Sequence, residues 1–201
     1  MTLAIDARDL APGFADPVFD SQSAFRAIMN AIAYPGRIER FRRPVAAPAG
    51  LSPAAATIAL TLCDFETPLW LDESAATEAA VAYLRFHSGA PIVDHAGRAR
   101  FCIIGGAASA LPLHAFHAGE DKYPDRSATL IIEAQSLTSG APRRWRGPGI
   151  KGERVVGVGG MKDSFWDEWT LNQTLYPLGV DVFFACGEEI VGLPRGVATE
   201  A

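Results

Sequence analysis

The sequence is poor in lysine. Only three occur, Lys122, Lys151 and Lys162, and each lies in a polar stretch rich in glycine or aspartate that we expect to be exposed. A pyridoxal-phosphate enzyme needs a desolvated lysine for its Schiff base. The pattern therefore argues against that chemistry, and we expect no cofactor.

Cysteine is also scarce. Cys63, Cys102 and Cys186 lie far apart inside apolar segments, and no C-x-x-C pair occurs. This spacing favours reduced, buried thiols in a cytoplasmic protein. The first residues lack the basic segment and apolar run of a signal peptide, and no apolar stretch reaches 18 residues. We expect neither a signal peptide nor a membrane partner.

Excess positive charge is missing as well. The 23 acidic and 18 basic residues give a net charge of −5, whereas a nucleic-acid-binding domain is usually strongly basic. We therefore expect no nucleic-acid partner. The chain has 201 residues, of which 49% are hydrophobic and 20% charged. This length and composition are typical of one globular domain.

Apolar periodicity predicts helices over residues 21–33, 52–63, 74–87 and about 163–175. Asp20 or Ser21 can cap the first helix, and Ser52 can cap the second, with Pro53 in its first turn. Strands are expected at "RARFCIIGG", over residues 127–137, and in "VDVFFACGEEIVGLPR", where two strands flank a turn at Gly187-Glu188. The segment "RRWR" could return antiparallel to strand 127–137.

Strands and helices in this order predict an α/β protein, a single three-layer domain with a mixed β-sheet. We expect the domain to cover residues 19–196. An N-terminal extension over residues 1–18 would precede it, and a C-terminal tail over residues 197–201 would follow it.

The stretch "RGPGIKGE" has the G-x-G-x-x-G spacing of a dinucleotide site from Gly147 to Gly152. That site needs a helix at its end, but the following "ERVVGVGG" has a β-like pattern. A phosphate loop fails too, because Glu153 and Arg154 stand where Lys and Ser or Thr are required. A Gly-Pro turn is favoured. The alternative is a free-standing nucleotide- or phosphate-binding enzyme that uses this loop and its arginines.

Arginines cluster in two stretches of this acidic chain, residues 37–43 and residues 143–154. The second contains Arg143, Arg144 and Arg146. Arginine clusters match phosphates, carboxylates or a partner subunit, although a solvated basic surface is an equally simple explanation. We take these three residues as possible ligand or interface residues.

Other polar groups have two explanations each. His114 and His117, with Glu120 and Asp121 nearby, have the spacing of metal ligands, but two histidines do not make a site and no metal is expected. Asp64, Glu66 and Thr67 either face a pocket or bond to backbone amides, and His87 falls at a helix end. Phe165, Trp166 and Trp169 form either core or a subunit interface. The nucleophile elbow, the H-E-x-x-H motif and the kinase motifs are absent, so no catalytic residue is expected.

Seven separated motifs together resemble one family. They are "FRAIMNAIAYPGRI", "LTLCDFETPLWL", "LRFHSGAPIV", "YPDRSATLII", "RGPGI", "YPLGVDVFF" and "LPRG", and they run from about residue 19 to residue 196. The family is the H subunit of the bacterial carbon–phosphorus lyase system, which degrades alkylphosphonates. Within these motifs, possible ligand residues are Arg26, Gly36, Asp64, Thr67, Trp70 and His87.

The resemblance implies a fold similar to the large domain of pyridoxal-phosphate-dependent transferases, without the cofactor. It also implies a homodimer that joins the G, I and J subunits in a core complex. That complex, together with a nucleotide-binding partner, forms ribose 1-phosphonate 5-triphosphate from ATP and the phosphonate. The family's chemistry is attributed mainly to I and J, so the resemblance implies a non-catalytic or accessory subunit.

Overall fold

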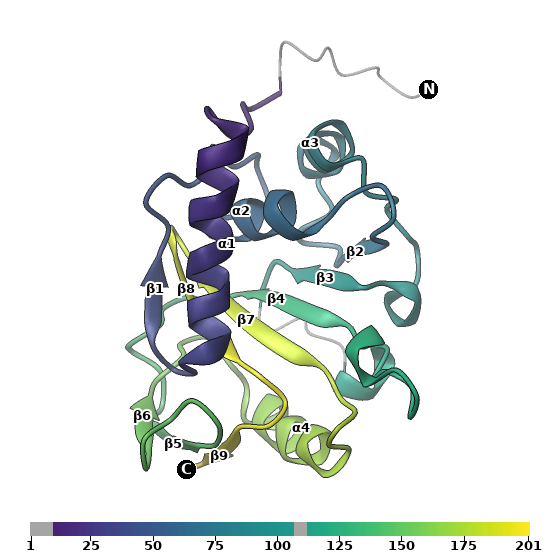
Figure 1. Ribbon diagram of the computed structural model, residues 1–201. Coiled ribbons are helices and arrows are strands. Elements are labelled where there is room, and N and C mark those ends of the chain that lie inside the picture. Colours follow the sequence, from purple (N-terminus) through teal and green to yellow (C-terminus); the bar gives the residue numbers. More distant parts are fainter. Residues whose placement is uncertain (1–9, 107–111) are drawn as a thin grey trace.

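The computed structural model describes residues 10–106 and 112–201. At its centre is a six-stranded sheet with the order β1-β8-β7-β4-β3-β2 (Figure 1). Strands β2, β3, β4 and β7 run parallel, whereas β8 and β1 are antiparallel to their neighbours. The predicted α/β class and mixed sheet are confirmed. The strands are β1 (Ile38–Arg40), β2 (Leu69–Leu71), β3 (Phe101–Ile104), β4 (Thr129–Glu133), β7 (Asp181–Cys186) and β8 (Glu189–Leu193).

The predicted strand positions hold at "RARFCIIGG" and in the β7–β8 hairpin, where Cys186 pairs with Glu189 across Gly187-Glu188. Strand β4 is shorter than the predicted 127–137 segment. Its pairing with β7 ends at Glu133, and Ser136 then forms only an isolated bridge to Gly159. Sequence periodicity placed the strand, but pairing with its neighbours set its length.

Four helices flank the sheet in the described residues. They are α1 (Pro17–Ala33), α2 (Pro53–Leu62), α3 (Glu78–Ser88) and α4 (Asp163–Thr174). The helix α2 begins as predicted, because the Ser52 side chain accepts a hydrogen bond from the amide of Ala55 at 3.1 Å. Short 3₁₀ turns occur at η2 (Ala96–Arg98), η4 (Leu113–Ala115) and η5 (Pro124–Arg126). No described helix is long and apolar enough to cross a membrane.

The predicted start of the first helix is wrong by one turn. Asp16 is the N-cap, and its carboxylate accepts a hydrogen bond from the amide of Phe19 at 3.2 Å. Asp20 lies inside the helix and accepts in return from the amide of Asp16 at 2.9 Å. Pro17 occupies the first turn, where its missing N–H costs nothing.

The third helix begins four residues later than predicted. Asp72 holds a separate turn before it, because its carboxylate accepts from the Ser74 hydroxyl at 2.9 Å and from the Ala75 amide at 2.8 Å. Thr77 then caps α3 through the amide of Ala80 at 3.0 Å. A short polar side chain that folds back on the backbone thus delays the helix.

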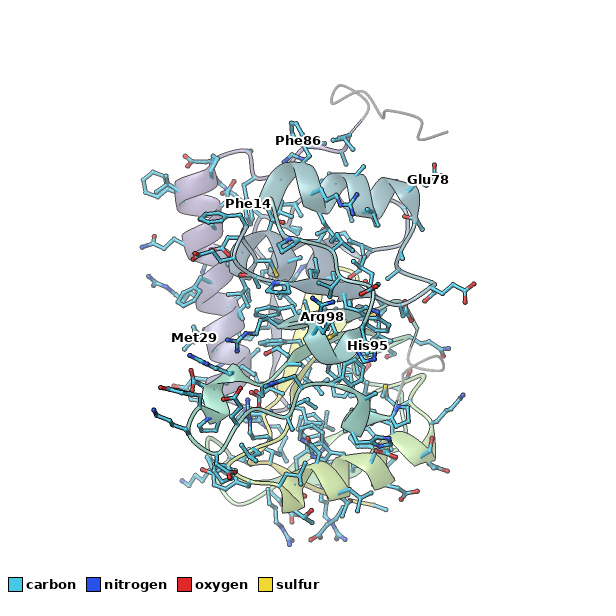
Figure 2. The ribbon with its side chains drawn as sticks, turned by 90° about the vertical axis from the view of Figure 1, so that its right-hand side faces the viewer. Phe14, Met29, Glu78, Phe86, His95 and Arg98 are labelled. Carbon is cyan, nitrogen blue, oxygen red and sulfur yellow. The ribbon has the colours of Figure 1, made fainter. Side chains whose placement is uncertain are left out.

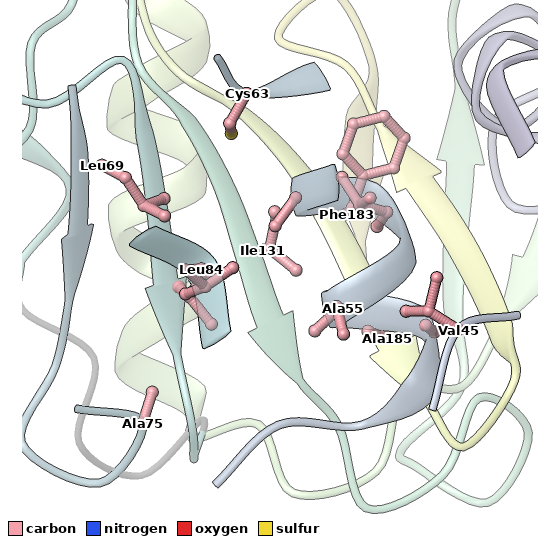
Figure 3. Close-up of a cluster of buried hydrophobic side chains, with 14 of the residues drawn as sticks. Val45, Ala55, Cys63, Leu69, Ala75, Leu84, Ile131, Phe183 and Ala185 are labelled. Carbon is pink, nitrogen blue, oxygen red and sulfur yellow. The ribbon is translucent and has the colours of Figure 1, made fainter. Parts of the chain in front are cut away.

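The alternation of side chains along the strands divides the core into two clusters. On β3, Ile103 faces α1–α3 while Cys102 and Ile104 face α4. Figure 3 shows the first cluster, in which Ala55 of α2 and Leu84 of α3 lie over the sheet. The second cluster contains the predicted aromatic group of α4, which is buried core. These two layers around a sheet fit the predicted three-layer arrangement.

A small three-stranded sheet of order β6-β5-β9 lies beside α4 (Figure 1). It consists of β5 (Arg143–Arg146), β6 (Arg154–Val156) and β9 (Ala198–Glu200). The predicted pairing of "RRWR" with the strand over residues 127–137 is therefore wrong, because β5 pairs with β6 and β9 instead. Its fully buried Trp145 directs the strand into the second core cluster. Residues 197–201, assigned to a tail by sequence, include β9.

The thiols are free. Cys63 and Cys102 are buried as predicted, whereas Cys186 at the end of β7 is half-buried. Burial raises the pKa of Cys63 to about 12 and also raises the pKa of Cys102. Both side chains are therefore protonated and unreactive at neutral pH.

Candidate functional site

A polar groove lies between helix α1 and the edge strand β1. Its volume is about 360 Å³, and it is lined by Gln22, Ser23, Arg26, Ala27, Asn30, Glu39, Arg40 and Arg42. We call it the α1–β1 groove. On the helix side, Gln22, Arg26 and Asn30 recur every four residues and so lie one above the other. On the other side, the basic stretch of residues 37–43 closes the groove.

The charges of the α1–β1 groove are only partly neutralised. Arg40 donates to Glu188 at 2.8 Å, and the Nε of Arg37 lies 3.0 Å from Oε1 of Glu39, an ion pair without hydrogen-bond alignment. Arg26 and Arg42 pair with no acid among residues 10–106 and 112–201. The groove therefore presents two free guanidinium groups, which suit a carboxylate or a phosphate.

An exposed apolar stripe runs along α1 next to the groove. We define the α1 stripe as Val18, Phe25 and Met29, whose exposed fractions are 72%, 49% and 49%. It spans about 16 Å at the helical rise per residue. Figure 2 shows Met29 on the outer side of the helix. Exposed apolar side chains beside unpaired arginines are typical of an interaction site.

The loop that begins at Asp64 uses its polar groups locally. Oδ1 of Asp64 accepts from the Thr67 hydroxyl at 2.7 Å and from the amide of Glu66 at 3.0 Å. The hydrogen bond from Thr67, and then that from Glu66, lower the pKa of the Asp64 carboxyl. These bonds fit the local explanation, one of the two that the sequence left open. Trp70 lies on β2, with its ring 6.0 Å from that of Phe116.

His87 holds the segment that precedes α1. Its Nε2 lies 3.0 Å from the carbonyl oxygen of Ala11, and its ring packs on Tyr83 at 4.5 Å between centroids. A Cβ on Gly13 would lie 2.9 Å from the His87 ring, so the close contact needs glycine there. A Cβ on Gly89, two residues beyond His87, would lie 3.6 Å from the Cβ of Phe65 in the Asp64 loop. His87 and this loop are thus neighbours, whereas Arg26 lines the α1–β1 groove.

Gly36 follows α1 and adopts φ +75°. A Cβ there would lie 2.6 Å from a methyl group of Val156 and 3.2 Å from the ring of Trp145. The guanidinium of Arg154 donates to the carbonyl oxygen of Pro35 at 2.9 Å. The "YPG" segment therefore anchors the end of α1 to the small sheet, and this contact explains its glycine.

The arginines of β5 have partners within the chain. Arg146 donates to Glu153 at 2.7 Å and lies 3.6 Å from Glu200. Arg144 donates to the carbonyl oxygen of Ala201 at 3.3 Å, and Arg143 stacks over the Trp166 ring at 4.8 Å. They therefore form no common free cationic site, unlike Arg26 and Arg42.

The glycine-rich stretch is a hairpin loop between the antiparallel strands β5 and β6. The amide of Ile150 donates to the carbonyl oxygen of Gly147 at 3.1 Å, and no helix begins at the end of the loop. A Cβ on Gly149 would lie 2.2 Å from the carbonyl oxygen of Ala33, so the loop packs directly on α1. The Gly-Pro turn is confirmed. The strand–turn–helix arrangement required by the nucleotide alternative is absent from this loop.

His114 and His117, the two histidines with the spacing of metal ligands, have separate environments. His114 lies 3.8 Å from Glu168, whereas Nδ1 of His117 accepts from the amide of Gly119 at 3.1 Å. Within the described ranges, no group of three potential ligands is placed to hold a metal ion. All three lysines are exposed, as predicted.

Sequence reasoning did not place Asn30, Glu39 and Arg42 in a site with Arg26. The available signals were the four-residue spacing along α1 and the basic stretch after it. These residues form one groove because β1 lies beside α1. The position of β1 is set by its pairing with β8, which is distant in the sequence, and not by the local sequence.

Fold and surface together define a class, an α/β protein with a mixed sheet that presents a cationic groove beside an apolar helix face. The chain belongs to the family described as bacterial phosphonate metabolism protein (PhnH), whose model matches residues 12–200. The resemblance found in the sequence is thereby confirmed.

Two relatives illustrate the family. Over 187 residues the chain is 40% identical to the alpha-D-ribose 1-methylphosphonate 5-triphosphate synthase subunit PhnH of Rhizobium meliloti (strain 1021), covering 93% of this chain and 94% of that protein. Over 176 residues it is 29% identical to the putative C-P lyase subunit protein HtxG of Stutzerimonas stutzeri, covering 87% and 83%.

Proposed function

We propose that the chain is an accessory, non-catalytic subunit of the assembly that forms ribose 1-phosphonate 5-triphosphate from ATP and a phosphonate in carbon–phosphorus lyase catabolism. The observation that carries this proposal is the 40% identity over 93% of the chain to a subunit of such a synthase. That similarity covers nearly the whole fold. The transferase and lyase steps would then lie on the other subunits.

The proposed partners are a second copy of the chain and the G, I and J subunits, in the cytoplasm, with no cofactor, nucleic acid or membrane. The free thiols support the proposed compartment. The exposed lysines support the proposal that no pyridoxal phosphate is bound. We also propose similarity to the large domain of pyridoxal-phosphate-dependent transferases. Its support is the run of four parallel strands with helices on both faces.

The α1 stripe and the α1–β1 groove are the surface that we propose for a partner subunit. The partner would bring apolar side chains to Phe25 and Met29 and carboxylates to Arg26 and Arg42. A symmetric contact between two copies centred here would oppose the same arginines, and like charges across an interface are unfavourable. A different, acidic subunit therefore suits this surface better than a second copy.

The test is to isolate the tagged chain from its own host, grown on methylphosphonate as sole phosphorus source, and to weigh it by native mass spectrometry. We expect a large hetero-oligomer. Arg26→Glu with Arg42→Glu should weaken assembly at least tenfold, whereas Arg85→Glu, an exposed arginine on α3, should not. A wild-type chain that emerges alone contradicts the proposed function. Normal assembly of the double variant contradicts only the choice of surface.

A further inference from the structure

Another pocket, of about 220 Å³, lies beside η2 and η5. It is lined by Gly97, Arg98, Ala99, Arg100, His117, Glu120 and Arg126. We call it the arginine pocket. Figure 2 shows Arg98 on η2, between α3 and α4 and away from α1. The arginine pocket is therefore distinct from the α1–β1 groove.

The three arginines of this pocket pair with no acid among the described residues. Arg126 stacks on the Tyr123 ring at 4.1 Å, a contact that orients its guanidinium without neutralising it. Three guanidinium groups and one carboxylate, Glu120, leave two positive charges in one pocket. Like charges that converge in this way repel one another until an anion lies between them.

The backbone under these arginines is fixed. The amide of Arg100 donates to the carbonyl oxygen of Pro68 at 2.8 Å, and its carbonyl oxygen accepts from the amide of Thr129 at 2.9 Å. Arg195 holds η5, because it donates to the carbonyl oxygen of Pro124 at 2.9 Å and to the hydroxyl of Ser127. The positions from which the arginines project are therefore built into the fold, which lowers the entropic cost of binding an anion.

His117 adds a neutral donor to the lining. Because its Nδ1 accepts from the amide of Gly119 at 3.1 Å, the proton of the neutral ring is on Nε2. The carbonyl oxygen of His117 in turn accepts from the amide of Ala128 at 2.7 Å, which ties the residue to the start of β4.

We propose that the arginine pocket binds a tetrahedral phosphorus dianion, as a free phosphate, a phosphonate or the terminal phosphate of a larger ligand. The net charge of the lining equals that of the dianion and is twice what a carboxylate would neutralise. Arginine forks match phosphoryl oxygens with two hydrogen bonds each. The volume corresponds to about seven waters, enough for one such group with part of its hydration shell. The inference concerns the isolated chain and does not depend on its assembly with partners.

The test is calorimetric titration of the full-length chain at low salt with inorganic phosphate, methylphosphonate, ATP and acetate. We expect at least one phosphorus ligand to bind with a Kd of about 1 mM or lower and acetate to bind at least tenfold more weakly. Arg100→Gln and Arg126→Gln should each weaken binding by about tenfold or more. Arg126→Lys, which keeps the charge but loses the fork, should fall between them and wild type.

The control is Arg144→Gln, an exposed arginine of β5, which should bind as wild type does. Circular dichroism melting checks that each variant is folded. Tight ATP binding with weak phosphate binding would identify a nucleotide as the source, and the reverse a free phosphate or phosphonate; either supports the proposal. Equal binding of acetate, no binding at 20 mM of any phosphorus ligand (about twentyfold above the expected Kd), or an equal loss in Arg144→Gln would overturn it.

Discussion

The two faces of the central sheet are filled by different side chains. Beneath α1–α3 the core is rich in alanine, and α2 alone buries Ala54, Ala55, Ala56 and Ala59. Beneath α4 and the small sheet it is aromatic, with Trp145, Trp166, Trp169, Phe165 and Phe184 in mutual contact. Among residues 10–106 and 112–201, three α-helices cover the first face and one covers the second. Small residues bring helix backbones close to the sheet, whereas large rings fill the space that fewer elements leave.

On the alanine-rich face, helix α1 approaches the sheet closely at a glycine of β8. A Cβ on Gly192 of β8 would lie 2.4 Å from the carbonyl oxygen of Ala31 in α1. The helix is thus held by its backbone, and its opposite side is left to carry the α1 stripe and Arg26. On the aromatic face, Arg146 of β5 forms an ion pair with Glu153, and Arg143 of β5 lies over the Trp166 ring. The proposed partner surface therefore lies over the alanine-rich layer.

Trp169→Ala should have the largest effect on stability, because it removes a large ring from the aromatic face of the core. The side chain is fully buried and its indole Nε1 donates to the carbonyl oxygen of Val197 at 2.9 Å, so the change opens a cavity and loses a hydrogen bond. We expect a loss of about 3–5 kcal/mol in the free energy of unfolding, measured by urea denaturation followed by circular dichroism. Leu171→Ala on the same helix, at a side chain 61% exposed, should change it by less than about 0.5 kcal/mol. Equal effects would mean that the aromatic cluster is not a packed core.

Ala55→Leu tests the opposite face by adding volume instead of removing it. Ala55 is fully buried between α2 and the sheet (Figure 3). Overpacking should destabilise the chain by about 1–3 kcal/mol, whereas Ala33→Leu at the exposed end of α1 should be within about 0.5 kcal/mol of wild type. Urea denaturation decides between them. A stabilised Ala55→Leu variant would reveal unfilled space beneath α2.

Much of this architecture follows from local patterns. The β7–β8 hairpin is announced by two apolar runs around Gly187-Glu188, and α2 by Ser52 followed by Pro53. Local sequence patterns do not show which strands pair when the two strands are distant in the sequence. The sequence of β5 does not show which strands it pairs with. It is the central strand of the small sheet, and its Trp145 is buried against Phe184.

The candidate binding sites, like the strand pairings, depend on contacts between segments that are distant in the sequence. The Asp64 loop and the glycine-rich loop both have motif-like sequences, yet their side chains and glycines serve local turns and the packing on Ala33. Arg98 and Arg100 lie outside the seven motifs, whereas Arg126 lies in "YPDRSATLII". The sequence does not show that they share a pocket, because their two segments meet only after β3 and β4 pair. Sequence identified Arg26, but not the residues that face it across the α1–β1 groove.

Ser52→Ala should have a smaller effect on stability, because it removes one helix cap on the alanine-rich face. The Ser52 hydroxyl accepts from the Ala55 amide, which otherwise has no partner within the helix. Loss of the cap should cost about 1 kcal/mol of unfolding free energy, measured by the shift in urea midpoint. Ser21→Ala, within the exposed first turns of α1, should cost less than about 0.5 kcal/mol. An unchanged midpoint for Ser52→Ala would show that packing alone fixes the start of α2.

Glu133 and Glu153 give the smallest effects, and these should have opposite signs. Glu133 lies at the end of β4, where burial raises the pKa of its carboxyl despite the bond from the Ser52 amide. The stability that it contributes is therefore present below the unfolded-state pKa near 4.5 and is lost as the pH rises through the folded-state pKa. Glu133→Gln, which stays neutral, should gain stability relative to wild type between pH 4 and pH 7, as followed by urea denaturation at each pH.

Glu153, on the β5–β6 hairpin, is the matched control from the other side of the molecule. The hydrogen bond from Arg146 lowers the pKa of its carboxyl. The stability that Glu153 contributes is thus present above the unfolded-state pKa and is lost as the pH falls through the folded-state pKa. Glu153→Gln should therefore lose stability relative to wild type over the same rise in pH, by a small amount because the pair is exposed. If Glu133→Gln also lost stability as the pH rose, the half-buried carboxylate at the start of α2 would be stabilised by the helix N-terminus more than it is penalised by burial.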